Sequence, residues 1–254
     1  MKIVAILQAR CNSTRLPNKV LKLIQGKPML QCQIERLQNC RSLDQLIVAT
    51  SDHDTDLPIV KLCGSIGIQC FTGDLQNVLD RMYNASCEAQ ADVVVRLTGD
   101  CPLTDAEIID SVVEKHLEEQ NDYTSNIDPE TFPDGLDVEV MSFSALKTAW
   151  LNANSSSDLE HVTPYIKSCD EFKKGSLLSS VDYSNYRWTV DEQIDFEFVS
   201  QVYGILGIEG RYFSSDEIYQ LLESRPDLQR VNSYISRNQG YKNSILHDAI
   251  EKKS

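Results

Sequence analysis

The sequence lacks the features of a membrane-bound or secreted protein. No uninterrupted apolar run approaches the ~18 residues of a membrane-spanning helix, so we expect no membrane span. The N-terminal stretch MKIVAILQAR has only six apolar residues before Gln8 and is charged again at Arg10, which is too short an apolar run for a signal peptide. We therefore expect a cytoplasmic protein that does not bind a membrane.

Two further absences exclude classes of site. None of the eight cysteines stands in a C-x-x-C pair, so zinc-ribbon and thioredoxin-like sites are not expected and the cysteines are interpreted as reduced thiols. The sequence also lacks G-x-x-x-x-G-K-[ST] and G-x-G-x-x-G, the phosphate-binding motifs of P-loop NTPases and dinucleotide-binding enzymes. A phosphate site in this chain must be built in another way.

Positive charge is scarce in most of the chain but not at its start. The whole sequence has 38 Asp and Glu against 24 Lys and Arg, a net charge of −14, which argues against a general nucleic-acid binder. Residues 1–34 nevertheless contain six Lys and Arg and no acidic residue, which leaves 18 basic and 38 acidic residues in the remainder. A cationic segment on an acidic body predicts a local anion site, although a cluster of solvated side chains would give the same count.

Strand and helix patterns alternate over the first 120 residues. Apolar runs typical of buried strands occupy residues 3–7, 45–50 and 92–97, and a further short strand is expected at 68–71. Helical patterns follow each run, at residues 28–39, 56–66, 77–90 and 104–119. Pro28 is expected at the first helical position, and Thr104 is expected to cap its helix with Glu107 in the reciprocal capping position. The alternation predicts an α/β fold with a doubly wound, mostly parallel sheet.

The alternation changes after residue 120. We expect further strands and helices at 136–142, 144–153, 158–168, 177–181, 191–204 and 214–223. After Pro226 the chain becomes polar. The sequence therefore predicts one domain over residues 1–225 and a tail over residues 226–254 that packs on a partner subunit.

Charged side chains are predicted to meet at one edge of the sheet, because ligands of open α/β sheets bind at the carboxyl ends of the strands. The loop after the first strand supplies Arg10, Arg15 and Lys19. The loop after the strand at 92–97 supplies Asp100. Since Arg and Lys neutralise phosphate oxygens and a carboxylate holds Mg²⁺, the two loops predict a site for a metal-bound polyphosphate.

The acidic run at residues 52–56 imitates the start of a calcium-binding loop. Leu57 stands where such a loop requires glycine, and Cys63 stands where it requires a bidentate glutamate, so an EF-hand is excluded. Asp52 follows a buried strand directly. It remains a candidate nucleotide contact, with a simple polar loop as the alternative.

Residues 8–19, QARCNSTRLPNK, closely resemble the signature of the nucleotide-sugar cytidylyltransferases, which include CMP-Kdo synthetase and the acylneuraminate cytidylyltransferases. The resemblance is closest to the spore-coat polysaccharide biosynthesis branch. Shorter matches extend it over about residues 2–205 in the expected order: GKPM (26–29), IVAT (47–50), VLDR (78–81), RLTGDCP (96–102), FPDGLDVE (132–139), EHVTPY (160–165) and RWTVD (187–191).

The resemblance implies a GT-A-like (Rossmann-like) nucleotide-diphospho-sugar transferase fold, with a small subregion for dimerisation or acceptor binding. It implies a homodimeric enzyme that uses Mg²⁺ to transfer CMP from CTP to a sugar acid, with release of pyrophosphate, in surface polysaccharide biosynthesis. Asp100 and Asp191 match the two metal-binding aspartates, and the catalytic positions are Arg10, Arg15, Lys19 and Asp100. The implied nucleotide contacts are Gln8, Ala9, Arg10, Ser13, Thr14, Arg15, Lys19, Asp52, Asp80, Arg81, Thr98 and Gly99.

Acceptor binding is assigned to the later motifs. Acids alternate with apolar residues from 134 to 139, which places Asp137 and Glu139 on one strand face, either as a wall for sugar hydroxyls or an acceptor amine or as a solvated face. His161 is a candidate acceptor contact or general base, and equally a helix-cap or core histidine. Arg187 is expected to bind an acceptor carboxylate or to pair with an acidic neighbour. The full set of acceptor candidates is Asp134, Asp137, Glu139, Glu160, His161 and Arg187.

Departures from the family pattern leave alternatives open. CMP-Kdo synthetases generally carry an acidic residue where this chain has Cys101, so neither Kdo nor sialic acid is assumed. A nucleophilic Cys101 is disfavoured because direct transfer needs no covalent intermediate. The alternatives are a sugar-phosphate nucleotidylyltransferase, a non-catalytic nucleotide-binding protein, and a GT-A glycosyltransferase, whose Asp-x-Asp motif has only residues 52–54 as a candidate.

Overall fold

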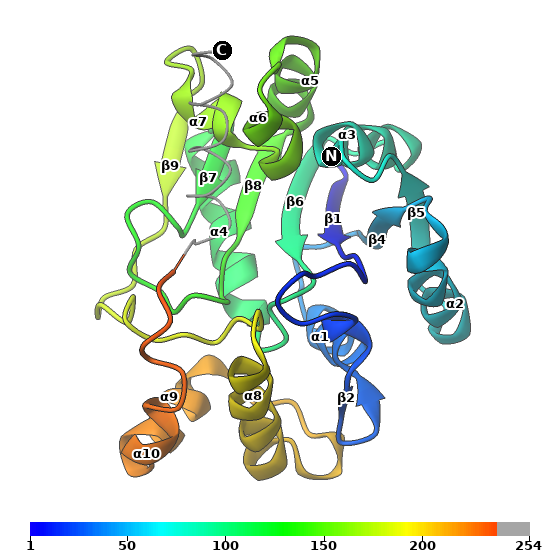
Figure 1. The fold of residues 1–254 in the computed structure, drawn as a ribbon. Coiled ribbons are helices and arrows are strands. Elements are labelled where there is room, and N and C mark those ends of the chain that lie inside the picture. Colours follow the sequence, from blue (N-terminus) through cyan, green and yellow to red (C-terminus); the bar gives the residue numbers. More distant parts are fainter. Residues whose placement is uncertain (238–254) are drawn as a thin grey trace, which may run out of the picture.

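A seven-stranded mixed sheet forms the centre of the computed structural model, which describes residues 1–237 (Figure 1). Four strands run parallel in the order β5-β4-β1-β6. Beyond β6, strand β8 is antiparallel to both its neighbours, and β9 is parallel to β7 at the edge. The strands of this sheet are β1 (Ile3–Gln8), β4 (Gln45–Ser51), β5 (Gln69–Gly73), β6 (Val93–Thr98), β7 (Tyr123–Ser125), β8 (Glu139–Ser142) and β9 (Lys174–Ser176).

Helices cover both faces of the sheet, and successive strand residues belong to two different cores. On β1, Ala5 and Leu7 lie in one core and Val4 and Ile6 in the other, and all four are fully buried. One core is completed by α1 (Met29–Leu37), α2 (Leu57–Ile66), α4 (Ala106–Glu119), α8 (Gln193–Leu206) and α9 (Ser215–Ser224). The other is completed by α3 (Val78–Glu88), α5 (Phe143–Asn152), α6 (Ser156–His161) and α7 (Pro164–Ser168). The predicted doubly wound, mostly parallel α/β fold is confirmed.

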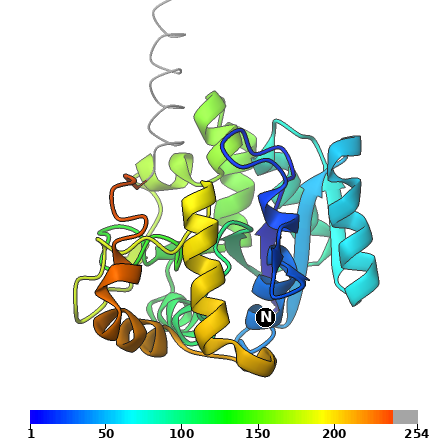
Figure 2. The ribbon, with the colours of Figure 1, turned by 60° about the horizontal axis from the view of Figure 1, so that its bottom comes forward.

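Short elements connect these layers. They are the hairpin of β2 (Leu23–Ile24) and β3 (Lys27–Pro28), the helix α10 (Pro226–Gln229), and the 3₁₀ turns η1 (Lys19–Leu21), η2 (Asp54–Asp56) and η3 (Ile208–Gly210). Helix α8 lies between the N-terminal segment and α9, as Figure 2 shows, and Gln25 Nε2 donates to Tyr203 O of α8 at 2.8 Å. Within the part of the chain that the structure describes, none of the helices combines the length and the apolar character that a membrane crossing requires.

The first half of the chain follows its predicted elements closely. The four strand predictions correspond to β1, β4, β5 and β6, and the helices α1 to α4 begin and end within two residues of the expected bounds. Two caps differ. Pro28 is the N-cap of α1 and not its first residue, and the N-cap of α4 is Asp105, whose carboxylate accepts a hydrogen bond from Glu107 N at 2.9 Å. The negative charge of Asp105 is favoured at a helix N-terminus, so it takes the place predicted for Thr104.

Predictions for the second half need three corrections. Strand β8 covers only the end of the predicted strand at 136–142, and 177–181 is not a strand, because its partner β7 ends at Ser125. The predicted helix at 158–168 is two helices, since Pro164 has no N–H and cannot continue α6. Val162 at the break has a φ of 71° and forms a γ-turn in which Thr163 N donates to His161 O at 2.8 Å.

A close backbone crossing separates β8 from the segment before it. Gly135 has a φ of 115°, and a Cβ on this residue would lie only 2.4 Å from Thr189 N. Glycine is therefore required where residues 134–136 pass against residues 187–189. The crossing is held by hydrogen bonds from Trp188 N and Thr189 N to Asp134 O, at 2.6 and 2.8 Å. It brings two of the motif segments together.

The described part of the expected tail packs on its own domain. Asn232 Nδ2 donates to Asp195 Oδ1 at 2.9 Å and to Arg187 O at 3.0 Å, and Asn232 is 1% exposed. Arg237 NH2 donates to Asp137 Oδ1 at 2.7 Å. The folded body therefore extends past the boundary predicted at residue 225. The expected packing of the tail on a partner falls on residues 238–254 as well, which lie outside the described residues.

His116 on α4 makes the stability of the fold depend on pH. It is 3% exposed, and burial lowers the pKa of its imidazole to about 4, so the folded protein keeps the ring neutral. The unfolded chain binds a proton near pH 6.5 and the folded chain does not, so this contribution to stability is present above pH 6.5 and is lost as the pH falls toward 4. We expect a loss of up to ~2 kcal/mol in the free energy of unfolding between pH 7 and pH 5 from this residue.

Urea unfolding of the wild type and of His116→Asn at the two pH values measures this effect. The variant is expected to be less stable at pH 7 and to lose less stability on acidification. An equal loss in the two proteins would show that His116 does not titrate as described.

Candidate active site

A cavity of about 1190 Å³ lies at the carboxyl ends of β1 and β6, where Gln8 and Thr98 belong to its lining. The sheet order reverses at this point, because β1 is flanked by β4 on one side and by β6 on the other. Figure 1 shows the loop after β1 crossing below the ends of these two strands. Ligands of doubly wound sheets bind at such a position, and the volume exceeds the ~300–1,000 Å³ of most ligand pockets, so two molecules can fit.

The loop after β1 is held by a buried carboxylate. Asp56 is fully buried and accepts hydrogen bonds from Cys11 N at 2.7 Å and from Ser51 Oγ at 2.5 Å. Asn18, in the left-handed region with a φ of 56°, closes the loop by donating from its backbone N to Cys11 O at 2.9 Å. Sequence reasoning treated Asp56 only as part of an acidic run. The only sequence feature that marks Asp56 as important is its position between a buried strand and a helix.

Lys19 lies between the two predicted metal ligands. Its Nζ donates to Asp100 Oδ2 at 3.1 Å, to Asp191 Oδ1 at 2.9 Å and to Val190 O at 2.8 Å, and its side chain is 10% exposed. Burial alone would lower the pKa of Lys19, but the two carboxylates outweigh it and raise the pKa. Burial would likewise raise the pKa of Asp100, and Lys19 holds it at about 2. Two aspartates far apart in the sequence therefore share one ammonium group.

The other predicted phosphate contacts surround this pair. Arg15 NH2 lies 3.0 Å from Asp191 Oδ1, whereas Arg10 lies at the exposed rim, with its NH2 3.7 Å from Glu160 Oε1. A Cβ on Gly99 would lie 3.0 Å from the Ala9 Cβ, so glycine is needed for the two loops to touch. The cavity lining includes Gln8, Ala9, Arg10, Ser13, Thr14, Arg15, Lys19, Arg81, Thr98, Gly99, Asp100 and Asp191.

Two predicted nucleotide contacts are not in the cavity lining. The Asp80 carboxylate accepts hydrogen bonds from Trp150 Nε1 at 2.8 Å and from Asn84 Nδ2 at 2.9 Å, which turns it toward α5. Asp52 is exposed, and its backbone N donates to Gly73 O at 2.9 Å. The structure therefore places Asp80 in the packing of two helices and Asp52 in a polar surface loop, so a nucleotide contact by either residue gains no support from it.

Arg81 is a largely buried residue of the cavity lining. The residue is 2% exposed, and its NH1 donates to Asp74 O at 2.6 Å. Its Nε is buried and has no hydrogen-bond partner among residues 1–237. An unsatisfied buried donor costs about 1–3 kcal/mol, so Arg81 is held here at a cost to stability.

Glu139 is engaged by four side chains. Tyr123 Oη and Thr163 Oγ1 donate to it at 2.5 and 2.7 Å, Lys167 Nζ lies 3.0 Å away, and Arg96 NH1 forms a second ion pair. Burial would raise the pKa of Glu139, but Lys167 and Arg96 outweigh it and lower the pKa below its usual range. Glu139 borders the cavity as a structural anion and not as an open strand face.

Asp137 is not paired with Glu139 on one face of a strand, because β8 begins at Glu139. Asp137 and Asp134 both line the cavity. Burial and the neighbouring Asp137 raise the pKa of Asp134 to about 7, and burial also raises the pKa of Asp137. These two acids remain candidate contacts for a polar acceptor.

Arg187 is a buried ion-pairing residue. Its NH1 donates to Asp134 Oδ2 at 2.8 Å, its NH2 to Asp191 Oδ2 at 3.1 Å, and its Nε to Asp195 Oδ1 at 2.9 Å. The side chain is 5% exposed and is not in the cavity lining. The expectation that Arg187 binds an acceptor carboxylate is therefore corrected, and pairing with acidic neighbours is what the structure shows. Asp195, which sequence reasoning missed, is fully buried beside it.

Two further residues of the lining, His161 and Cys101, have side chains that could take part in chemistry. His161 Nε2 lies 3.8 Å from Glu160 Oε2, and burial lowers the pKa of His161, which keeps the ring neutral near pH 7. The γ-turn at Val162, rare for a β-branched residue, sets the direction of the segment that carries His161. Cys101 is buried, and its burial beside Asp100 raises the pKa of the thiol well above the usual range, so a thiolate nucleophile is disfavoured.

The donor set at Asp100 and Asp191 suits Mg²⁺. This ion takes one or two protein carboxylates and completes its octahedral shell with water and phosphate oxygens. No cluster of three or more His, Cys, Asp or Glu side chains suited to a metal occurs in the described residues. The two aspartates would therefore not form a complete Mg²⁺ site alone. They would hold the ion together with phosphate oxygens of a ligand.

The fold and the cavity together define a nucleotidyltransferase. Counted in chain order, the strands of the sheet stand in the order 3-2-1-4-6-5-7, with the cationic loop after the first strand and the aspartate pair opposite it. The cytidylyltransferase family model matches residues 4–222, and the chain belongs to this family. The family resemblance inferred from the motifs is confirmed.

Individual relatives agree with this assignment. The chain is 38% identical over 248 residues to an uncharacterised protein of Methanocaldococcus jannaschii, covering 95% of this chain and 98% of that protein. It is 31% identical to the spore coat polysaccharide biosynthesis protein SpsF of Bacillus subtilis, covering 89% of this chain and 95% of SpsF. A solved cytidylyltransferase from Leptospira borgpetersenii matches with a TM-score of 0.86 at 27% identity, over 91% of this chain and 97% of that one.

Proposed function

We propose that this cytidylyltransferase uses Mg²⁺ to transfer CMP from CTP to a hydroxyl group of a sugar acid, with release of pyrophosphate, in the synthesis of a surface polysaccharide. The observation that carries the proposal is the position of Arg15 and Lys19 against Asp100 and Asp191 in one cavity with room for two ligands. The similarity to SpsF supports the polysaccharide context.

The loop after β1 would hold the triphosphate, and Arg81 would face the base. Cytosine presents two acceptors, N3 and O2, whereas uracil carries a hydrogen on N3. A guanidinium can only donate, so a paired contact of Arg81 to both O2 and N3 would favour cytosine, whereas a single contact to a carbonyl oxygen would not, because uracil offers O2 and O4. The position of Arg81 in the cavity lining supports this placement.

The reaction would be an in-line displacement at the α-phosphorus of CTP. The acceptor oxygen attacks phosphorus, the bond to the bridging oxygen breaks, and pyrophosphate leaves with the electron pair. Arg10, Arg15 and Lys19 line the cavity where they can stabilise the charge on the leaving group. Mg²⁺ held by Asp100 and Asp191 would polarise the α-phosphate and make the attacking hydroxyl more acidic. The remaining contribution of the protein is to position the two substrates.

The opposite part of the cavity suits an acidic acceptor. Lys167 and Arg96 both line it and share the single carboxylate of Glu139, which leaves one positive charge for an acceptor carboxylate. The neutral ring of His161 is a candidate base for the proton of the attacking hydroxyl. Asp134 and Asp137 would meet further hydroxyl groups or an amine.

A screen of acceptors, read by pyrophosphate release with CTP and Mg²⁺, tests the proposal. The panel contains 3-deoxy-2-ulosonic acids and nonulosonic acids, with sugar 1-phosphates as members that lack the carboxylate. We expect release with a sugar acid and none with UTP in place of CTP. Release with sugar phosphates alone would indicate a sugar-phosphate nucleotidylyltransferase. CTP binding without turnover on the whole panel would contradict an enzymatic role.

We propose that the protein is cytoplasmic and forms a homodimer, on the strength of the family resemblance. Sedimentation equilibrium of the purified protein tests the dimer. The glycosyltransferase alternative loses support, because none of Asp52, Asp54 and Asp56, which form the Asp-x-Asp pattern of this segment, lines the cavity.

A further inference from the structure

The Lys19 ammonium stands at the position where the two proposed metal ligands converge. Its Nζ lies 3.1 Å from Asp100 Oδ2 and 2.9 Å from Asp191 Oδ1, with Val190 O as a third acceptor at 2.8 Å. We propose that Lys19 is an internal cation that competes with Mg²⁺ for this aspartate pair, so that the enzyme binds the metal tightly only together with the nucleotide. The inference rests on the proposed function in taking Asp100 and Asp191 as metal ligands.

A metal ion and the Lys19 ammonium cannot both occupy this place, because both are positively charged. A divalent cation bound to both carboxylates would lie within a few ångströms of the ammonium, and like charges repel strongly at that distance in a partly buried site. Lys19 would have to leave the aspartates. Its side chain is 10% exposed, and a buried charge without a counter-charge is costly. The nucleotide-free protein is therefore expected to bind Mg²⁺ weakly.

A triphosphate removes this obstacle. Lys19 and the preceding basic residue Arg15 both line the cavity, so phosphate oxygens bound there offer the ammonium new acceptors without returning it to water. Asp100 and Asp191 are then free to bind the metal that accompanies the triphosphate. Because coupling between two ligands is reciprocal, the metal must also tighten the binding of CTP.

No other cation of the described residues contacts both carboxylates. Arg15 contacts Asp191 and its side chain is 35% exposed, so it can move without a large penalty. Arg187 also contacts Asp191, but it is tied to the fully buried Asp195. The competition is thus specific to Lys19, which makes it testable with one substitution.

Mn²⁺ binding followed by electron paramagnetic resonance provides the test, with Mn²⁺ in place of Mg²⁺ and no acceptor present. The variants are Lys19→Met and the matched control Lys22→Met, whose ammonium lies 5.1 Å from the Phe196 ring centroid and is not in the cavity lining. Wild type and Lys22→Met are expected to bind Mn²⁺ at least ~10-fold more tightly with CTP than without it. Lys19→Met is expected to bind Mn²⁺ at least ~10-fold more tightly than wild type without CTP, and to gain less from CTP.

The outcomes separate this inference from the proposed function. Equal Mn²⁺ affinity of wild type and Lys19→Met without nucleotide, combined with tight binding in the presence of CTP, would overturn the inference and leave the metal site standing. Absence of Mn²⁺ binding by every protein even with CTP would overturn the metal site and the inference together. Circular dichroism checks the fold, and Lys19→Gln, which keeps hydrogen-bond donors without the charge, gives the same test if Lys19→Met does not fold.

Discussion

Replacing Asp100 by Asn is expected to lower kcat for CMP transfer by about 10²–10³-fold. The substitution removes one of the two carboxylates that meet at Lys19, and with it half of the protein charge available to a metal ion. It keeps the size of the side chain, so Thr98, Gly99 and the loop around them are expected to retain their positions. The measurement is pyrophosphate release at saturating CTP, Mg²⁺ and a competent acceptor.

The control for this variant is Asp216→Asn. Asp216 is exposed in the first turn of α9 and is not in the cavity lining, so it loses the same charge without touching the site. We expect its kcat to match wild type. Calorimetry should show that Asp100→Asn still binds CTP through the basic loop. Full turnover by Asp100→Asn would show that the metal assignment is wrong.

Replacing Arg187 by Met is expected to lower the free energy of unfolding by about 3–5 kcal/mol, as for other broken buried ion pairs. Arg187 is 5% exposed on its side chain and contacts Asp134, Asp191 and Asp195, of which Asp195 is fully buried. Without the guanidinium, Asp195 keeps hydrogen bonds from the N–H groups of residues 191 and 192 but has lost the cation that balances its charge. Urea unfolding at pH 7 measures the loss.

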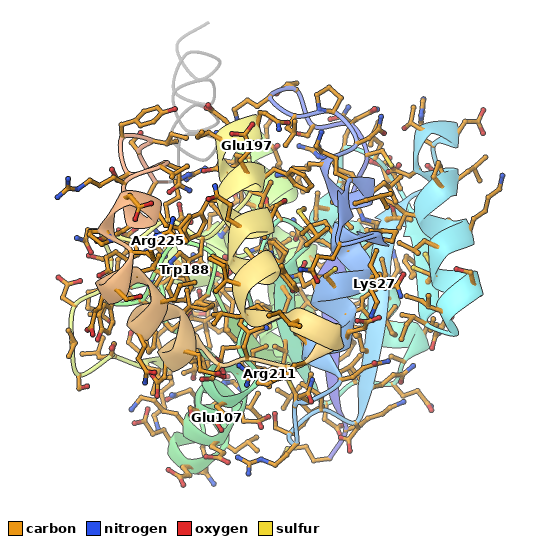
Figure 3. All side chains as sticks on the ribbon, turned by 90° about the horizontal axis from the view of Figure 1, so that it is seen from below. Lys27, Glu107, Trp188, Glu197, Arg211 and Arg225 are labelled. Carbon is orange, nitrogen blue, oxygen red and sulfur yellow. The ribbon has the colours of Figure 1, made fainter. Side chains whose placement is uncertain are left out.

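A matched arginine is available on the surface. Arg225, labelled in Figure 3, forms an ion pair with Asp227 at 2.7 Å, with 47% and 66% of the two side chains exposed. Solvent screens such exposed pairs, so Arg225→Met should change stability little. In contrast, the double variant Arg187→Met, Asp195→Asn should recover part of the loss, because it removes the uncompensated charge.

The stability of Arg187→Met also separates two interpretations of this residue. If Arg187 bound an acceptor carboxylate, its substitution would raise KM for the acceptor and leave the unfolding free energy near that of wild type. The structure predicts instead that the main effect of the substitution is a lower free energy of unfolding, and that any change in KM for the acceptor is smaller. A stable variant with a raised acceptor KM would contradict the assignment of Arg187 to the interior.

Local sequence patterns were enough to predict the strands that are buried on both faces and the loops that meet at one edge of the sheet. The apolar runs at 3–7 and 92–97 define β1 and β6, and parallel strands bring the residues that follow them to one edge. The proximity of Lys19 to Asp100 follows from that geometry. The pairing of Asp100 with Asp191, which lie far apart in the sequence, could be predicted only from the family resemblance.

The roles that could not be predicted from the sequence depend on contacts between residues that lie far apart along the chain. Asp56 becomes important because Cys11 N reaches it, and Glu139 is closed off by Tyr123, Thr163 and two cations. Arg187 could be read equally as a ligand contact or as an ion-pair residue, since only burial decides between them. The α6–α7 break was missed although Pro164 marks it in the sequence, because the helical pattern continues on both sides of the proline and the γ-turn at Val162 has no local sequence signal.

A crystal structure of the protein with CTP and Mn²⁺, in which anomalous scattering locates the metal, is the most direct test of the proposed metal site. We expect Mn²⁺ bound by an oxygen of Asp100 and an oxygen of Asp191 together with phosphate oxygens, and Lys19 Nζ moved from the carboxylates to the triphosphate. A metal bound elsewhere, or a triphosphate held away from the loop after β1 while Lys19 still joins the two aspartates, would contradict it.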